Sequence, residues 1–208
     1  MAYPGGIPNF ISMTFPVLTH QLRSENINGN SMIGQTERRT TMKTKTQKIT
    51  PFLWFDDQAE QAVIFYTSIF KNSGIVSTTR YGEEGAEVSG RPKGTAMTVA
   101  FRLDGQEFVA LNGGPIFKFS EAISFVVHCE SQDEVDYYWG KLSEGGDPKA
   151  QQCGWLKDKY GLSWQIVPTI LVKLLNDPDP ETSRRVMKAM LQMKKIDIQT
   201  LHQASRAS

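Results

Sequence analysis

The strongest constraint on the fold of this chain is an internal repeat at a displacement of 74 residues. Asp57 is followed three positions later by Glu60, and Ser131 is followed in the same way by Glu134. Each pair has the spacing of a capping box, which closes the start of a helix. The same displacement aligns Thr50 with Ser124, Leu53 with Val127 and Phe65 with Trp139. A repeat of this length, too long for a solenoid, indicates two copies of one supersecondary unit.

The first copy has the pattern of a strand, a helix and three further strands. Apolar alternation predicts strands over residues 49–55, 74–81, 95–103 and 107–112, with an amphipathic helix over 59–70. Asp104-Gly105 is a hairpin turn signal between the last two strands. The segment from Gly105 to Phe108 is echoed by the segment from Gly161 to Trp164, with shorter loops in the second copy. We therefore predict an α+β fold made of two tandem βαβββ modules.

The chain becomes helical after Pro168. The segment TILVKLLN precedes a break at NDPDPE, where Asp179 can cap a helix and Pro180 can take its first position. The next segment, SRRVMKAMLQMKK, places its methionines on one side, which favours a core or dimer contact over a promiscuous binding face. A last short helix, DIQTLHQA, follows.

Charge is distributed unevenly along the 208 residues. The net charge is +1, but residues 1–48 carry +4 and the remainder carries −3. A mildly acidic domain without a basic stripe argues against nucleic acid as a partner. No apolar run is long enough for a membrane span and none reads as a secretory signal, so we expect a cytoplasmic protein. Cys129 and Cys153 stand alone, without the spacing of a zinc site or a disulfide framework.

Residues 1–47 read as a disordered N-terminal extension, because their polar composition shows no sustained period. Two alternatives are an organelle transit peptide and an over-extended gene start, since Met42 opens the compact segment MKTKTQKITPFLWF. The extension is expected to be dispensable, and the domain is expected to cover residues 48–204.

The combination of ITPFLWF, ALNGGP, WGKLSEGG, GWLKDKYGLSWQIVP and MKKIDIQTL resembles the PhnB-like family. This family is often labelled 3-demethylubiquinone methyltransferase and belongs to the vicinal oxygen chelate superfamily of glyoxalases, bleomycin-resistance proteins and dioxygenases. The resemblance covers about residues 48–204. It implies a curved mixed sheet around a small-molecule cavity that is usually completed in a homodimer.

Metal-using members of that superfamily hold one divalent ion with His or Gln and Glu side chains. Carried over, the four ligand positions fall at Thr50, at Ser124, at Gln165 and at either Val109 or Asn112. Hydroxyl and amide oxygens are weak partners for a transition metal. We therefore expect no metal and no other cofactor.

Three residues could overturn that expectation. His128 shares the strand face of Ser124, so it could act as a ligand or a base. Glu107 shares the face of Val109, although a solvated rim position fits its place beside the turn better. Asp158, between Lys157 and Lys159, reads as part of an exposed charge cluster.

Strand alternation predicts an aromatic-walled pocket with a few hydroxyl and amide groups. The residues expected to bind substrate are Thr50, Phe52, Trp54, Asn112, Ser124, His128, Trp155 and Gln165. A plain aromatic core is the alternative for Trp54 and Trp155. The methyltransferase label has no support, because the glycines between 82 and 94 lie in a hairpin-like loop instead of a parallel strand-to-helix turn.

Three functions fit these features. The first is a metal-independent binding protein or enzyme for an apolar or aromatic metabolite. The second is a metal-dependent glyoxalase-like or dioxygenase-like enzyme that uses His128, Gln165 and Glu107. The third is a sequestering resistance protein with a dimeric cleft. The sequence supplies no residue that decides whether a reaction is catalysed.

Overall fold

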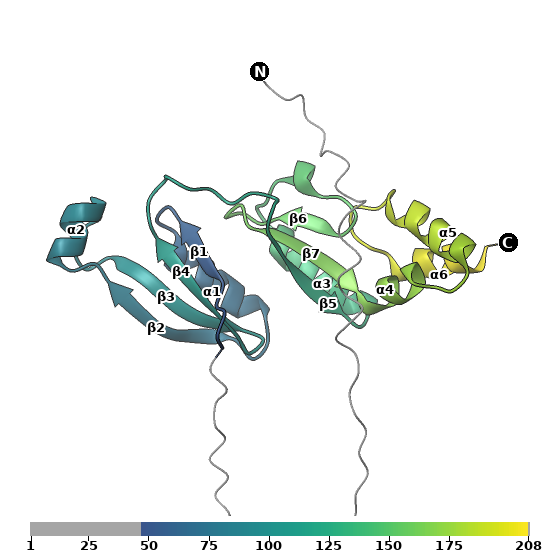
Figure 1. Ribbon diagram of the computed structural model, residues 1–208, viewed down its shortest axis with the longest axis horizontal. Coiled ribbons are helices and arrows are strands. Elements are labelled where there is room, and N and C mark those ends of the chain that lie inside the picture. Colours follow the sequence, from purple (N-terminus) through teal and green to yellow (C-terminus); the bar gives the residue numbers. More distant parts are fainter. Residues whose placement is uncertain (1–46, 208) are drawn as a thin grey trace, which may run out of the picture. The chain divides into compact units, whose positions relative to one another are not determined.

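The computed structural model describes residues 47–207 (Figure 1). The predicted N-terminal extension lies outside these residues except for Gln47. The described part holds two successive groups of strands with their helices, followed by three helices, which confirms the predicted α+β class and its tandem order.

The first module forms a four-stranded sheet in the order β1-β4-β3-β2. β1 is parallel to β4, and the other pairs are antiparallel. Asp104 and Gly105 both have positive φ angles, as the predicted hairpin turn between β3 and β4 requires. Its elements are β1 (Phe52–Phe55), α1 (Ala59–Ile69), β2 (Gly74–Arg80), α2 (Glu83–Ser89), β3 (Ala96–Leu103) and β4 (Gln106–Asn112).

The second module forms a three-stranded sheet in the order β5-β7-β6. Its elements are β5 (Ser124–Cys129), α3 (Gln132–Ser143), β6 (Trp155–Lys157) and β7 (Ser163–Pro168). A short 3-10 turn at Pro148–Ala150 stands where the repeat predicts a fourth strand. The segment between α3 and β6 holds Gly145, Gly146, Pro148 and Gly154, which are poor strand formers. The second copy is therefore βαββ and not βαβββ.

The predicted helices after Pro168 are present as α4 (Thr169–Leu175), α5 (Pro180–Met190) and α6 (Ile198–Arg206). Asp179 caps α5 by accepting hydrogen bonds from the backbone N–H groups of Glu181 and Thr182, both at 3.1 Å. Val186 and Met190 are buried, and α5 packs against α4 and α6. The methionine stripe of α5 is thus mainly a core contact.

The two helix starts that the repeat predicts are built differently. Ser131 caps α3, since its hydroxyl accepts from the backbone N–H of Glu134 at 3.3 Å. The capping box at Asp57 is wrong, because α1 begins at Ala59 without a cap from its own segment. The side-chain oxygen of Asn112, at the end of β4, accepts from the N–H of Ala59 at 2.8 Å instead.

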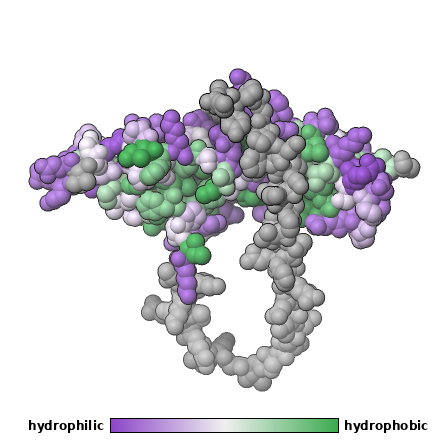
Figure 2. All heavy atoms as spheres, turned by 45° about the horizontal axis from the view of Figure 1, so that its top comes forward, coloured by the Kyte–Doolittle hydropathy of each residue, from purple (hydrophilic) through white to green (hydrophobic). Residues whose placement is uncertain are grey.

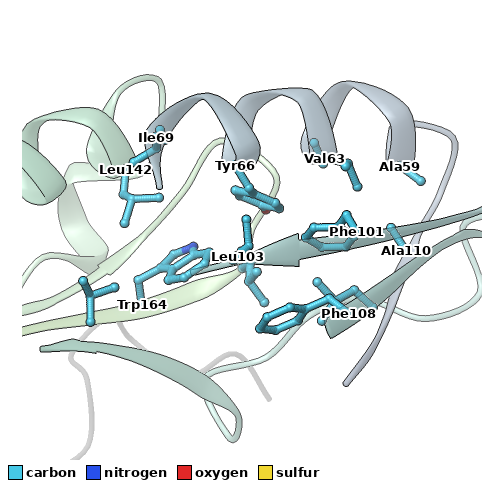
Figure 3. Packing of buried hydrophobic residues seen from close by; sticks show 14 of the residues in the cluster. Ala59, Val63, Tyr66, Ile69, Phe101, Leu103, Phe108, Ala110, Leu142 and Trp164 are labelled. Atoms are coloured by element: carbon cyan, nitrogen blue, oxygen red, sulfur yellow. The ribbon is translucent and has the colours of Figure 1, made fainter. Parts of the chain in front are cut away.

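One buried cluster joins both modules. α1 covers β3 and β4, and its residues Val63 and Tyr66 point toward the sheet in Figure 3. The rings of Phe108 and Phe125 lie 5.2 Å apart, and those of Phe125 and Trp164 lie 5.6 Å apart. Aromatic contacts therefore pass from the first sheet into the second.

Candidate functional site

The first sheet has one buried face and one more open face. On β1, Leu53 and Phe55 are buried, whereas Trp54 is half-buried and Phe52 is 57% exposed. The strand register places Val109 beside Phe52 and Leu111 beside Trp54. Since paired residues share a face, these side chains form an apolar wall on the side of the sheet opposite α1.

The second sheet presents a more polar face. Ser124 and Val126 on β5 lie beside Ser163 and Gln165 on β7, and Gln165 also lies beside Trp155 on β6. The amide nitrogen of Gln165 donates a 2.8 Å hydrogen bond to the hydroxyl of Ser124. The opposite face of this sheet is buried. The more open face therefore combines an aromatic ring with a paired amide and hydroxyl.

Apolar side chains also reach the surface near these faces. Figure 2 shows green apolar patches between the purple residues of the described surface. Large exposed apolar residues of β1, β5 and the connection between the modules are Phe52, Val126, Ile116, Phe117 and Ile123.

The structure brings together most of the predicted binding residues in two groups. Phe52 and Trp54 share the open face of the first sheet, and half-buried Thr50 precedes them. Ser124, His128, Trp155 and Gln165 share the open face of the second sheet.

Asn112 lies apart from both groups. It is 7% exposed on the face of the first sheet that α1 covers. Its oxygen caps α1, and its nitrogen donates to the carbonyl of Ala96 at 3.0 Å. Val109, the other residue that sequence reasoning left open for this position, lies on the open face.

Trp54 is held in place by the loop that follows β4. Its indole nitrogen donates a 2.8 Å hydrogen bond to the carbonyl of Gly114. Its ring meets Phe117 edge to face, with 4.9 Å between the ring centroids. A Cβ atom on Gly113 would lie 2.3 Å from the indole, so only glycine leaves room for this ring. A fixed aromatic wall with its polar atom already satisfied suits contact with an apolar ligand.

The side chains at the four positions that correspond to metal ligands in the resembled superfamily do not fit a transition metal. Gln165 and Ser124 offer an amide and a hydroxyl that are hydrogen-bonded to each other, Thr50 offers a second hydroxyl, and Val109 offers no donor atom. Among residues 47–207, no group of three or more His, Cys, Asp or Glu side chains is placed to hold an ion. Glu107 pairs across strands with Arg102 at 2.8 Å, as expected of a rim position.

Asp158 corrects the prediction of an exposed charge cluster, because it is 3% exposed. One carboxylate oxygen accepts from the Tyr66 hydroxyl and the Trp164 indole nitrogen, each at 2.8 Å. The other accepts from the backbone N–H groups of Tyr160 and Leu162. Burial raises the pKa of Asp158, although these four hydrogen bonds oppose that shift. The carboxylate is a structural centre between the modules.

Sequence reasoning missed a pocket beside the Trp54 wall. An open pocket of about 390 Å³ is lined by Asp56, residues 89–92 and residues 113–116. The first loop follows α2, a helix where the sequence predicts only a hairpin-like loop. A signal was available in the similar loop sequences Gly90-Arg91-Pro92 and Gly113-Gly114-Pro115.

A family model described as 3-demethylubiquinone-9 3-methyltransferase matches residues 47–167. The chain belongs to this family. Its PhnB-like character, which the sequence motifs predict, agrees with the PhnB protein among the solved structures below. A comparison with curated proteins found no match.

Solved structures include a PhnB protein from Bacillus cereus, described as a putative 3-demethylubiquinone-9 3-methyltransferase. It is 40% identical, with a TM-score of 0.52, and the match covers 59% of this chain and all of that one. A Staphylococcus aureus protein is 30% identical over 59% of this chain and 96% of its own, with a TM-score of 0.27. The fosfomycin resistance protein FosX of Listeria monocytogenes is 14% identical over 60% and 93%, with a TM-score of 0.38.

The methyltransferase in the family description finds no matching nucleotide site in the described residues of this PhnB-like chain. The glycine-containing segment around α2 joins β2 to β3, which are antiparallel. The one turn from a strand into a helix within the parallel β1–β4 unit is Asp56-Asp57-Gln58, which contains no glycine. A dinucleotide or adenosyl-methionine site normally uses a Gly-rich turn at that point.

In residues 47–207 no helix has the length and hydropathy needed to cross a membrane.

Proposed function

We propose that this PhnB-like chain binds an apolar or aromatic small molecule on the open sheet faces, without a metal ion. The observation that carries the proposal is the Trp54 wall, which the glycines after β4 and Phe117 hold in one orientation. Rigid aromatic surface with a few fixed polar groups is the usual composition of a small-molecule site. Trp155 and the Ser124–Gln165 pair supply a second wall of the same kind.

We also propose that the chain assembles into a homodimer. β1 and β5 are edge strands, and they occupy equivalent positions in the internal repeat. Both carry an apolar side chain on the open face, with Phe52 57% and Val126 38% exposed. An edge strand with such residues is suited to pair with another strand. If β1 of one copy meets β5 of a second copy, the twofold relation repeats the contact and brings the two kinds of wall together.

Tryptophan fluorescence tests the binding proposal. A neutral aromatic amide such as phenylacetamide should quench the emission of the full chain in a saturable way. Trp54→Phe should remove most of that response, and Trp155→Phe should reduce it. Trp139→Phe is the matched control, because Trp139 lies on α3 and packs against the core cluster. A response that survives Trp54→Phe together with Trp155→Phe would contradict the proposed site.

A further inference from the structure

We propose that the pocket beside Trp54 binds the carboxylate of the ligand through Arg91. This inference rests on the proposed function and extends it, since it names the charged end of the apolar molecule. The pocket is lined mostly by two Gly- and Pro-containing loops, at residues 89–92 and 113–116. Arg91 and Asp56 are the two charged residues of its lining.

Arg91 has N–H groups that its contact with Asp56 does not use. Its side chain is 20% exposed, and its Nη2 contacts both the backbone oxygen and the carboxylate of Asp56. A guanidinium carries five N–H donors in a planar fork. Within residues 47–207, Nε and Nη1 have no hydrogen-bond partner. A carboxylate can accept a charge-assisted hydrogen bond from either of these groups.

Asp56 sets the charge of the ligand. Its carboxylate holds Arg91 at 2.5 Å but is 47% exposed, so it stays hydrated when Arg91 takes a second partner. One arginine and one nearby carboxylate favour a single negative charge, since a phosphate dianion would be repelled by Asp56 without a second cation. The geometry therefore favours a carboxylate over a phosphate.

The Trp54 wall beside the pocket determines which group is attached to the carboxylate of the ligand. Gly113 and Gly114 line the pocket, and the same two residues contact the indole of Trp54. A carboxylate at Arg91 would thus place its attached group toward the Trp54–Phe117 pair. We infer that the ligand class is an apolar or aromatic carboxylic acid.

The test compares phenylacetate with phenylacetamide, which have the same shape but differ in charge. The full chain should bind phenylacetate about 10- to 100-fold more tightly, the effect expected of hydrogen bonds to a charged group. Arg91→Gln should abolish this preference, so that the two compounds bind with similar affinity. Asp56→Asn should strengthen phenylacetate binding several-fold, because a competing carboxylate is gone. Arg80→Gln is the matched control, since Arg80 pairs with Glu60 outside the pocket.

Nuclear magnetic resonance separates the two proposals. Phenylacetate should shift the amide signals of Gly113 and Gly114 and the Nε signal of Arg91. Equal affinity for both compounds, or no shift of these signals, would overturn the carboxylate site, whatever the tryptophan response. Shifts at Arg91 without any quenching would support the carboxylate site and contradict the aromatic wall. If Arg91→Gln does not fold, Asp56→Asn and the resonance shifts in the unmodified chain give the same decision.

Discussion

The hydroxyl of Tyr66 donates a 2.8 Å hydrogen bond to the carboxylate of Asp158, which lies 92 positions later in the chain. Tyr66 is on α1 of the first module, and Asp158 is in the turn before β7 of the second. Both are buried. The bond therefore joins the two halves of the internal repeat through a buried carboxylate. If the bond is lost, this carboxylate cannot replace it with a hydrogen bond to solvent.

Tyr66→Phe should lower the free energy of unfolding by about 1.5–3 kcal/mol, the range for a hydrogen bond to a charged group. Urea unfolding of the full chain measures this loss. Tyr137→Phe is the control, because the Tyr137 hydroxyl donates to the neutral carbonyl of Ile69 from a residue that is 44% exposed. A loss at Tyr66 no larger than that at Tyr137 would contradict the assigned role of Asp158.

Asp158 should also make stability depend on pH. Burial raises its pKa in the folded protein, so the folded state binds this proton more tightly than the unfolded chain. The resulting stabilisation is complete below the unfolded pKa of about 3.9 and is lost as pH rises through the folded value. Asp158→Asn lacks this titration. As pH rises above about 4, the unfolding free energy of the wild type should therefore fall relative to that of the variant in urea experiments. A relative rise would show that the four hydrogen bonds outweigh burial.

Gly113→Ala should displace the Trp54 ring, since the new Cβ would lie 2.3 Å from it. We expect a loss of about 1–3 kcal/mol from overpacking, together with altered tryptophan emission. Gly140→Ala is a control of opposite sign. Gly140 lies within α3 with no atom near its added Cβ, so alanine should stabilise the helix by about 0.5–1 kcal/mol. An unchanged emission spectrum in Gly113→Ala would contradict the close packing of the Trp54 ring against Gly113.

Phe52→Asp should produce a monomer at micromolar concentration, because a charge on β1 opposes pairing of this edge with a second copy. Light scattering measures the mass. Ile64→Asp should leave the dimer intact, since Ile64 is equally exposed, at 59%, but lies on α1 away from both edges. A wild-type chain of monomer mass would refute the dimer itself.

Purified protein should hold well under one equivalent of transition metal, and a chelator should leave its melting temperature unchanged. A metal bound to the folded state would stabilise it by linkage, so its removal would lower that temperature. Metal analysis before and after chelation checks this expectation. Stoichiometric metal that is lost in His128→Ala would favour the metal-dependent alternative.

Features that depend on neighbouring residues could be predicted from the sequence. Ser131 caps α3 because the partner of its hydroxyl is only three positions away. The period of two also placed Trp54 and Gln165 on the more open faces of their sheets. The cap of α1 was missed because Asn112 comes from 53 positions away and shares no local pattern with Ala59.

Asp158 shows a second limit of sequence reasoning. Between two lysines it has the pattern of an exposed turn, and its burial depends on Tyr66 and Trp164 converging from different modules. The Arg91 pocket has the same origin, since its two loops are separated by β3 and β4. In each case the decisive contact is between segments that only the tertiary fold brings together.

The aromatic contacts from Phe108 through Phe125 to Trp164 bear on how this chain can lose its structure. A repeated sequence suggests two halves that could survive alone. Here, separation would leave Phe108 without its partner ring, would expose Trp164 to solvent and would strip Asp158 of the Tyr66 donor. The halves of the duplication have thus become mutually dependent, and they should melt in one cooperative transition instead of two.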